Sequence, residues 1–153
     1  MSALIQTAYV VRRRIFGWLR LRTRGVKVML FNEDGEILLI RNSYGNRDLF
    51  VLPGGGIGRR ENPAAAATRE VMEEVGLEVT GLTLVATYRS GAEGKRDSIC
   101  LFQGRASGVP RTDSIEIDEA GYYGLNDLPT NVSPATRRRI EEVSGKPPID
   151  GRW

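Results

Sequence analysis

The sequence contains no histidine and a single cysteine among its 153 residues. Without histidine, Ser-His-Asp and Cys-His catalytic groups are excluded, as are the histidine ligands of most catalytic zinc sites. One cysteine cannot form an intrachain disulfide, which favours a reducing compartment, and we expect a cytoplasmic protein. The neighbours of Cys100 are apolar, so we expect its thiol to be buried in a strand. Acid–base chemistry must therefore use carboxylates, lysine, tyrosine or metal-bound water.

Long apolar runs are also missing, including from the N-terminal segment, residues 1–24. Arg12, Arg13 and Arg14 interrupt this segment before any run approaches the roughly 18 apolar residues that a membrane span needs. Its charges follow the apolar residues, whereas a signal peptide has them first. We therefore expect no membrane span, and an amphipathic helix packed on the domain. Binding of that helix to an anionic membrane surface is the alternative.

The charge excess is small. A net charge of +3 and a pI near 9.3 suit ligands that carry phosphate and do not require a nucleic acid. The length favours one domain, which we place at residues 25–145, and the tail at 146–153 is expected to be loosely held.

The pattern of strands and helices is neither an alternating βα repeat nor all-β, so we expect a mixed sheet covered by helices. An Asp34-Gly35 pair predicts a hairpin between the first two strands. Ser133 is the expected N-cap of a terminal helix whose arginines, 137–139, are expected to face solvent. The predicted strands cover residues 26–31, 36–41, 49–52, 77–89, 98–106 and 119–125.

Three glutamates stand out near the end of a further predicted helix, which starts after Asn62 and stops at Gly76. Glu70, Glu73 and Glu74 share one helical face, where like charges repel by roughly 0.2–0.5 kcal/mol per pair. They also lie at the negative end of the helix dipole. A bound cation would offset both costs, and Mg²⁺ is typically bound through carboxylates together with substrate phosphates.

The surrounding segment resembles the signature of the Nudix hydrolase family: glycine, five residues, glutamate, seven residues, Arg-Glu, an apolar residue, any residue, Glu-Glu, any residue, glycine and an apolar residue. No position departs from this pattern. At average amino-acid usage its fixed positions would match by chance on the order of a few times in a billion. Those positions are Gly55, Glu61, Arg69, Glu70, Glu73, Glu74 and Gly76.

This resemblance implies a fold, an α/β/α sandwich with a mixed sheet, and it also implies an enzymatic reaction. That reaction is hydrolysis of the pyrophosphate linkage in a nucleoside diphosphate derivative, with Mg²⁺ or Mn²⁺ as cofactor. By the family pattern Glu73 and Glu74 are the leading metal ligands, and Glu70 is a further ligand or the group that deprotonates water. Gly54 would offer its backbone carbonyl to the metal, and Arg69 would orient a carboxylate of the motif.

Many family members add a carboxylate from a loop about 40 residues beyond the helix. Glu116 and Glu119 both lie at that distance. We favour Glu116 as a metal ligand or general base, because a loop side chain can swing toward substrate while a strand fixes the direction of Glu119. Two solvated acids are the alternative.

Candidate substrate contacts lie in loops and at strand ends. Gly55 and Gly56 precede the helix N-terminus, where backbone can approach phosphate. Arg41 and Tyr44 could touch phosphate and base, and Arg89 could bind polyphosphate. A surface arginine, a packing tyrosine and a solvated loop are the alternatives for these three.

The sequence leaves the substrate open among a nucleoside triphosphate, an ADP-ribose-like sugar nucleotide and an oxidised nucleotide. One alternative is removal of pyrophosphate from RNA 5′ ends, with the basic N-terminal segment holding the strand. Few aromatic residues interleave with those arginines, so we do not expect a nucleic-acid partner. A non-catalytic nucleotide-binding domain is the other alternative, and a homodimer stays open.

Overall fold

The computed structural model describes residues 24–90, 97–147 and 151–153. The N-terminal helix expected within residues 1–24 lies almost wholly outside the described residues. The elements are β1 (Arg24–Phe31), β2 (Ile37–Asn42), β3 (Phe50–Val51), α2 (Pro63–Val75), β4 (Thr80–Ser90), β5 (Asp97–Arg105), β6 (Ile117–Tyr123) and α3 (Pro134–Val143).

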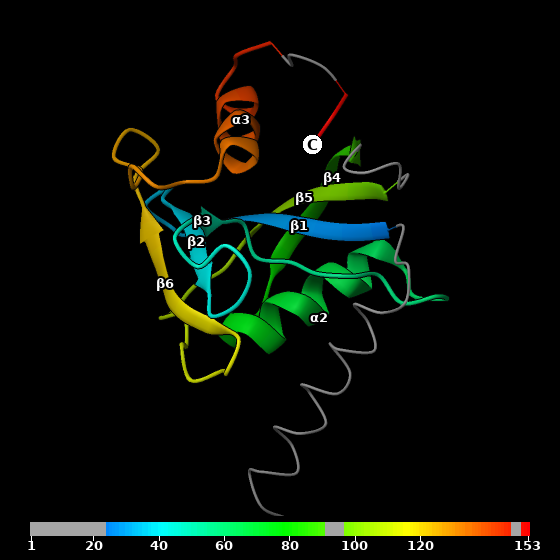
Figure 1. Cartoon of the computed structure of the whole chain (residues 1–153), viewed down its shortest axis with the longest axis horizontal. Helices are drawn as coiled ribbons and strands as arrows, with labels where there is room; N and C mark the ends of the chain where they lie inside the picture. The colour runs from blue at the N-terminus through cyan, green and yellow to red at the C-terminus, as the bar shows by residue number, and fades with distance from the viewer. Residues whose placement is uncertain (1–23, 91–96, 148–150) are drawn as a thin grey trace, which may run out of the picture.

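The strands form one mixed sheet in the order β3-β2-β1-β5-β4, with β6 paired to β2 (Figure 1). β1 runs parallel to β5, and the other pairs are antiparallel. The Asp34-Gly35 hairpin is confirmed, since Phe31 pairs with Ile37 and Gly35 has a φ of 76°. Only that one pair joins β1 to β2, so the central strand gains most of its hydrogen bonds from β5.

Helices cover both faces of the sheet, which confirms the predicted α/β/α sandwich. Strand residues alternate between the faces. Val26, Val28 and Cys100 pack in the cluster that includes α2, whereas Met29 and Leu101 pack in the cluster that includes Ile140 of α3. Cys100 is buried, as its apolar neighbours predicted.

The strand boundaries differ from the predicted ones mainly at β4 and β6. β4 begins at Thr80 rather than at residue 77, since Leu77 instead packs under the helix. β6 begins at Ile117, two residues before the predicted start, and Glu119 therefore lies within the strand. Among the described residues no helix is long and apolar enough to cross a membrane.

Residues 151–153, at the end of the tail that the sequence suggested to be loosely held, pair with the end of β4. Arg89 at the end of the edge strand donates its amide to the Gly151 carbonyl (3.0 Å) and accepts from the Trp153 amide (3.0 Å). The Trp153 ring meets Tyr88 edge-on at 5.7 Å. Pairing of this kind covers a stretch of edge strand that would otherwise expose its hydrogen-bonding groups.

Candidate active site

Helix α2 carries the motif acids, and its ends form as the sequence predicted. The Asn62 side chain accepts from the Ala64 amide at 2.8 Å, and Pro63 occupies the first turn. Gly76 ends the helix in the left-handed conformation (φ 69°), where a side chain would be strained. The apolar residues of the helix pack on the sheet and set its rotation: Ala66, Ala67, Val71 and Val75. With this rotation Glu70 (5% exposed) and Glu74 (2% exposed) also point inward.

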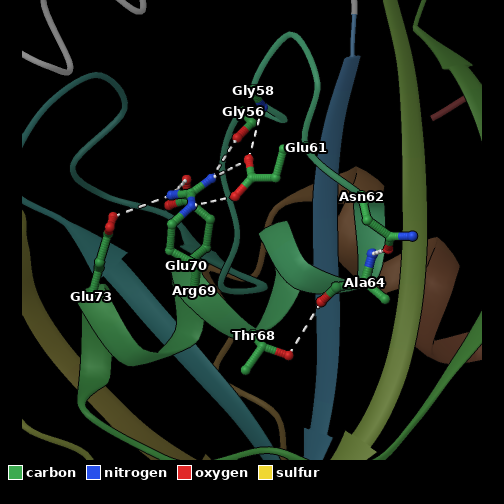
Figure 2. A network of polar contacts seen from close by, with 9 residues as sticks. All are labelled: Gly56, Gly58, Glu61, Asn62, Ala64, Thr68, Arg69, Glu70 and Glu73. Atoms are coloured by element: carbon green, nitrogen blue, oxygen red, sulfur yellow. Dashed lines mark hydrogen bonds and ion pairs between the residues drawn. The ribbon is translucent and has the colours of Figure 1, made fainter.

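Arg69 is the centre of the polar network on this helix (Figure 2). Its guanidinium binds both oxygens of Glu61, at 2.7 and 2.9 Å. One nitrogen, Nη1, also donates to Glu70 Oε1 at 2.7 Å and to Glu73 Oε2 at 3.3 Å. The hydrogen bond to Glu61 is the main cause that raises the pKa of Arg69, with Glu70 adding to it. The arginine therefore stays charged and draws three carboxylates of the motif together.

The glycine loop closes directly over the buried acids. The Gly54 amide donates to Glu74 Oε2 at 2.8 Å. A Cβ on Gly55 would come within 2.6 Å of the Glu70 carboxyl carbon, so a larger residue there would displace that carboxylate. A Cβ on Gly54 would lie 2.2 Å from the Val26 carbonyl oxygen, and the φ of Gly54 is 142°. The loop thus needs glycine to run between β1 and the carboxylates.

The residues present suit a hard divalent cation in donor type, because they are carboxylates and backbone carbonyls. Glu70 and Glu73 both reach the same nitrogen of Arg69, so their oxygens converge on one region. Within the described ranges, no group of three or more Asp, Glu, Cys or His side chains is already arranged around a metal position. In this conformation the guanidinium lies where the two carboxylates meet.

The two candidates for the distal carboxylate lie in different surroundings. Glu116 is 7% exposed and precedes Ile117, which belongs to the cluster under α2. Glu119 is paired with Arg41 at 3.1 Å, and both side chains are partly exposed. Arg41 alternates with Ile37 and Leu39, which pack on the α3 side of the sheet. Glu119 therefore lies on the face of the sheet opposite the motif, whereas Glu116 is buried at the start of β6, and the role of either acid stays a prediction.

The predicted substrate contacts are only partly brought together. Gly55 and Gly56 lie at the motif, where Gly56 accepts from Arg69 at 3.1 Å. Arg41 faces the other side of the sheet. Tyr44 is 49% exposed in the loop after β2. Arg89 lies at the end of β4, where it pairs with Ser98 near the start of β5, and it is not beside the motif acids. These contacts stay predictions.

Sequence reasoning missed the residue that places Glu116. The Ser43 amide donates to the Glu116 carbonyl at 2.9 Å, and the Ser43 hydroxyl donates to the Ile115 carbonyl at 2.5 Å. The ion pair between Arg41 and Glu119 was also missed. Both depend on the pairing of β2 with β6, which are 75 or more residues apart, and no local pattern signals it.

Comparisons with known proteins agree with this geometry. A family model described as the NUDIX domain matches residues 21–143. An RNA pyrophosphohydrolase of Stutzerimonas stutzeri is 41% identical over 64 residues, which is 42% of this chain and 39% of that protein. Another RNA pyrophosphohydrolase, from Rhizobium meliloti, is 28% identical over an alignment that covers 77% of this chain and 88% of that one.

Among solved structures, the MutT NUDIX hydrolase of Burkholderia pseudomallei is 28% identical and superposes with a TM-score of 0.70, covering 79% of this chain and 97% of that one. The chain spans about two fifths of the length of the first curated relatives that it matches. The family match, by contrast, includes every strand and both described helices. From the complete motif, the sandwich fold and this match, we conclude that the chain belongs to the Nudix family.

Proposed function

We propose that this chain is a metal-dependent pyrophosphohydrolase that acts on nucleoside diphosphate derivatives. The observation that carries the proposal is the convergence of the motif acids. Glu70 and Glu74 are buried against the glycine loop, and Glu73 reaches the nitrogen that also binds Glu70. Arg69 offsets only part of the charge of Glu61, Glu70 and Glu73, and a divalent cation would offset the remainder.

The motif residues would divide the work as follows. Glu73 and Glu74 would hold Mg²⁺ or Mn²⁺, with the Gly54 carbonyl and Glu70 as further ligands. When bound, the cation offsets the negative charge of the pyrophosphate and of the transition state. Arg69 positions Glu70, and the Gly54 amide positions Glu74.

A water must lose a proton when it attacks phosphorus, and two carboxylates could accept it. Glu70 is one, as the buried acid of the Arg69 network. Glu116 is the other, as the buried acid at the start of β6. Gly55 and Gly56 expose little beyond backbone and would let a phosphate approach the helix closely.

Small nucleotides are the first substrate class: a nucleoside triphosphate, an ADP-ribose-like sugar nucleotide or an oxidised nucleotide. RNA 5′ ends are a second candidate, because two of the similar proteins named above are RNA pyrophosphohydrolases. We also propose that the protein works in the cytoplasm, since its one thiol, Cys100, is buried and unpaired.

Turnover against a panel of these compounds tests the proposal. Released phosphate or pyrophosphate is measured with millimolar Mg²⁺ or Mn²⁺ and again with excess chelator. We expect hydrolysis of at least one compound, and its loss on chelation. The metal should also raise the melting temperature, a readout that does not depend on turnover. Full activity in chelator would refute the metal-dependent mechanism.

A further inference from the structure

Four arginines gather at the N-terminal end of α2, away from the motif glutamates. Arg24 opens β1 and Arg89 lies near the end of β4, and both pair with Ser98 of β5 between them. Adjacent strands are about 4.8 Å apart, which puts the Cα atoms of the two arginines roughly 10 Å apart. Arg59 and Arg60 lie in the turn before α2, where the Ile57 amide donates to the Arg24 carbonyl at 3.2 Å.

All four side chains are exposed, and Arg24 and Arg89 are on the same face of the sheet. Arg24 alternates with Val26 and Val28, which pack under α2. Arg89 alternates with Thr87, whose hydroxyl contacts the Cys100 sulfur of the same cluster at 3.8 Å. Figure 1 shows the starts of β1, β5 and α2 together at one side of the molecule.

These arginines have no acidic partner among the described residues: none of the ion pairs involves them. Glu61, the acid next to Arg60 in the sequence, is bound by Arg69. The segment that joins Ser90 to Ser98 carries two acids, Glu93 and Asp97, and two basic residues, Lys95 and Arg96, so its composition adds no net negative charge. The first turn of α2 carries no acid. The segment 1–23 contains no acid either, so its composition cannot neutralise the group. One exposed arginine needs no explanation, but four uncompensated ones on one surface form a positive patch.

The patch and the motif acids are connected by α2. Glu70 lies eight residues beyond Asn62 and Glu74 twelve, which corresponds to about 12–18 Å along a helix. Arg69 and the Gly56–Gly58 loop lie between them. A mononucleotide bound at the acids would not need arginines so far away. A chain of phosphodiesters that begins at the acids would extend far enough to contact these arginines.

From this placement we propose that Arg24, Arg59, Arg60 and Arg89 form a binding surface for the phosphodiester chain of single-stranded RNA whose 5′ end lies at the motif glutamates. This surface rests on the proposed pyrophosphohydrolase function and specifies its substrate class. It departs from the expectation that nucleic acid is not a partner. That expectation considered only the N-terminal arginines, because the strand register that collects these four is not visible in the sequence.

The test measures binding separately from hydrolysis. The probe is an unstructured ten-nucleotide RNA with a 5′-monophosphate and a 3′ fluorophore, which has no pyrophosphate to cleave. Fluorescence anisotropy gives its affinity for the full chain at several salt concentrations. The variants are Arg59→Gln with Arg60→Gln, and Arg24→Gln with Arg89→Gln. The control, Arg105→Gln with Lys146→Gln, removes the same charge from exposed sites elsewhere.

We expect each patch variant to weaken binding at least tenfold at low salt, and the control to change it less than threefold. Each lost phosphate contact should lower the slope of log affinity against log salt by about 0.7, so a double variant should lower it by about 1.4. Equal losses in the control and patch variants, or no loss in either, would overturn the proposal. So would tight binding of inorganic polyphosphate with no binding of the RNA.

Hydrolysis separates this proposal from the proposed function. With a 5′-triphosphorylated RNA the Arg59→Gln/Arg60→Gln variant should show a raised KM, while its turnover of a nucleoside triphosphate stays unchanged. A chain that hydrolyses nothing but binds the RNA through the patch would refute the pyrophosphohydrolase alone. A chain that hydrolyses small nucleotides with no effect of the patch on RNA would refute this inference alone.

Discussion

Two arginines, one on each face of the sheet, are held by glutamates in ways that differ instructively. Arg69 binds Glu61, Glu70 and Glu73, and its side chain keeps 26% of its exposure. Arg139 on α3 is completely buried, pairs with one carboxylate, Glu142, at 2.8 Å, and stacks over the Tyr88 ring at 4.1 Å. The first has more acids around it than one cation balances; the second has one acid and an aromatic surface.

Surplus charge and balanced charge distinguish a binding site from a structural support. Around Arg69 the surplus negative charge lies next to a glycine loop that admits backbone and excludes side chains. Around Arg139 one cation faces one carboxylate: Nη2 binds Glu142 at 2.8 Å, Nη1 donates to the Arg152 carbonyl at 2.9 Å, and Glu142 also accepts from Tyr88 at 3.0 Å. Within the described part of the chain the Nε atom has no hydrogen-bond partner, so what is balanced here is the charge and not every donor. Surplus charge indicates that something is to be bound, and matched charge indicates that the structure is complete.

Arg139→Met should have the largest effect and should act on stability. Removing one partner of a buried ion pair costs about 3–5 kcal/mol, since Glu142 would stay buried with less compensation. The cation–π contact and the bond to the tail would also be lost. Urea unfolding measures the loss, and Arg137→Met on the same helix is the control, expected to lose about 1 kcal/mol or less. Equal losses of unfolding free energy in the two variants would show that Arg139 stabilises the fold no more than Arg137 does.

Glu73→Gln and Glu74→Gln should lower the catalytic rate, whereas Arg139→Met lowers stability. An amide is a weak ligand for Mg²⁺, so we expect each to lower turnover by at least about 10²-fold. Stability should hold for Glu73→Gln, because repulsion on the helix is relieved. Unfolding and turnover are measured on the same preparations, with Glu78→Gln as a control. Near-normal rates in both variants would make the acids structural, like Glu142 beside Arg139.

The choice between Glu116 and Glu119 sharpens the contrast between the faces. Glu116→Gln should lower turnover at saturating metal and substrate by tenfold or more, as expected for a general base or a ligand. Glu119→Gln should change turnover little and cost at most about 1 kcal/mol of stability, since its pair with Arg41 is exposed. The reverse pattern would transfer the role to Glu119.

Local signals in the sequence were enough to predict α2 and the motif. Asn62, Pro63 and Gly76 mark the helix ends through backbone preferences that act within a few residues. The solvent-facing arginines expected at 137–139 were wrong for Arg139. Its partners Tyr88 and Trp153 come from β4 and the tail, and helical spacing alone does not reveal them. In the same way, the pairing of β2 with β6 decides which face Glu119 occupies.

The smallest effect is expected at Tyr88, which links the two halves of the Arg139 cluster. Its hydroxyl donates to Glu142 Oε2 at 3.0 Å, and burial, followed by that hydrogen bond, raises the pKa of the phenol above its ordinary value. Tyr88→Phe removes this bond and should cost about 1 kcal/mol at neutral pH.

The pH dependence of that cost has a definite sign. A phenol whose pKa is higher in the folded state than in the unfolded chain stabilises the fold fully below the unfolded value, near 10. The advantage of wild type over Tyr88→Phe should therefore be constant from about pH 7 to 9 and shrink as the pH rises above 10. Urea unfolding of both proteins at pH 8 and pH 10.5 measures it. Tyr123→Phe is the control, because its pKa is also raised by burial while its hydroxyl lies outside the Arg139 cluster. A gap that widens at alkaline pH would show that Tyr88 does not stabilise the cluster through its proton, and would leave ring stacking as the reason for its position beside Arg139.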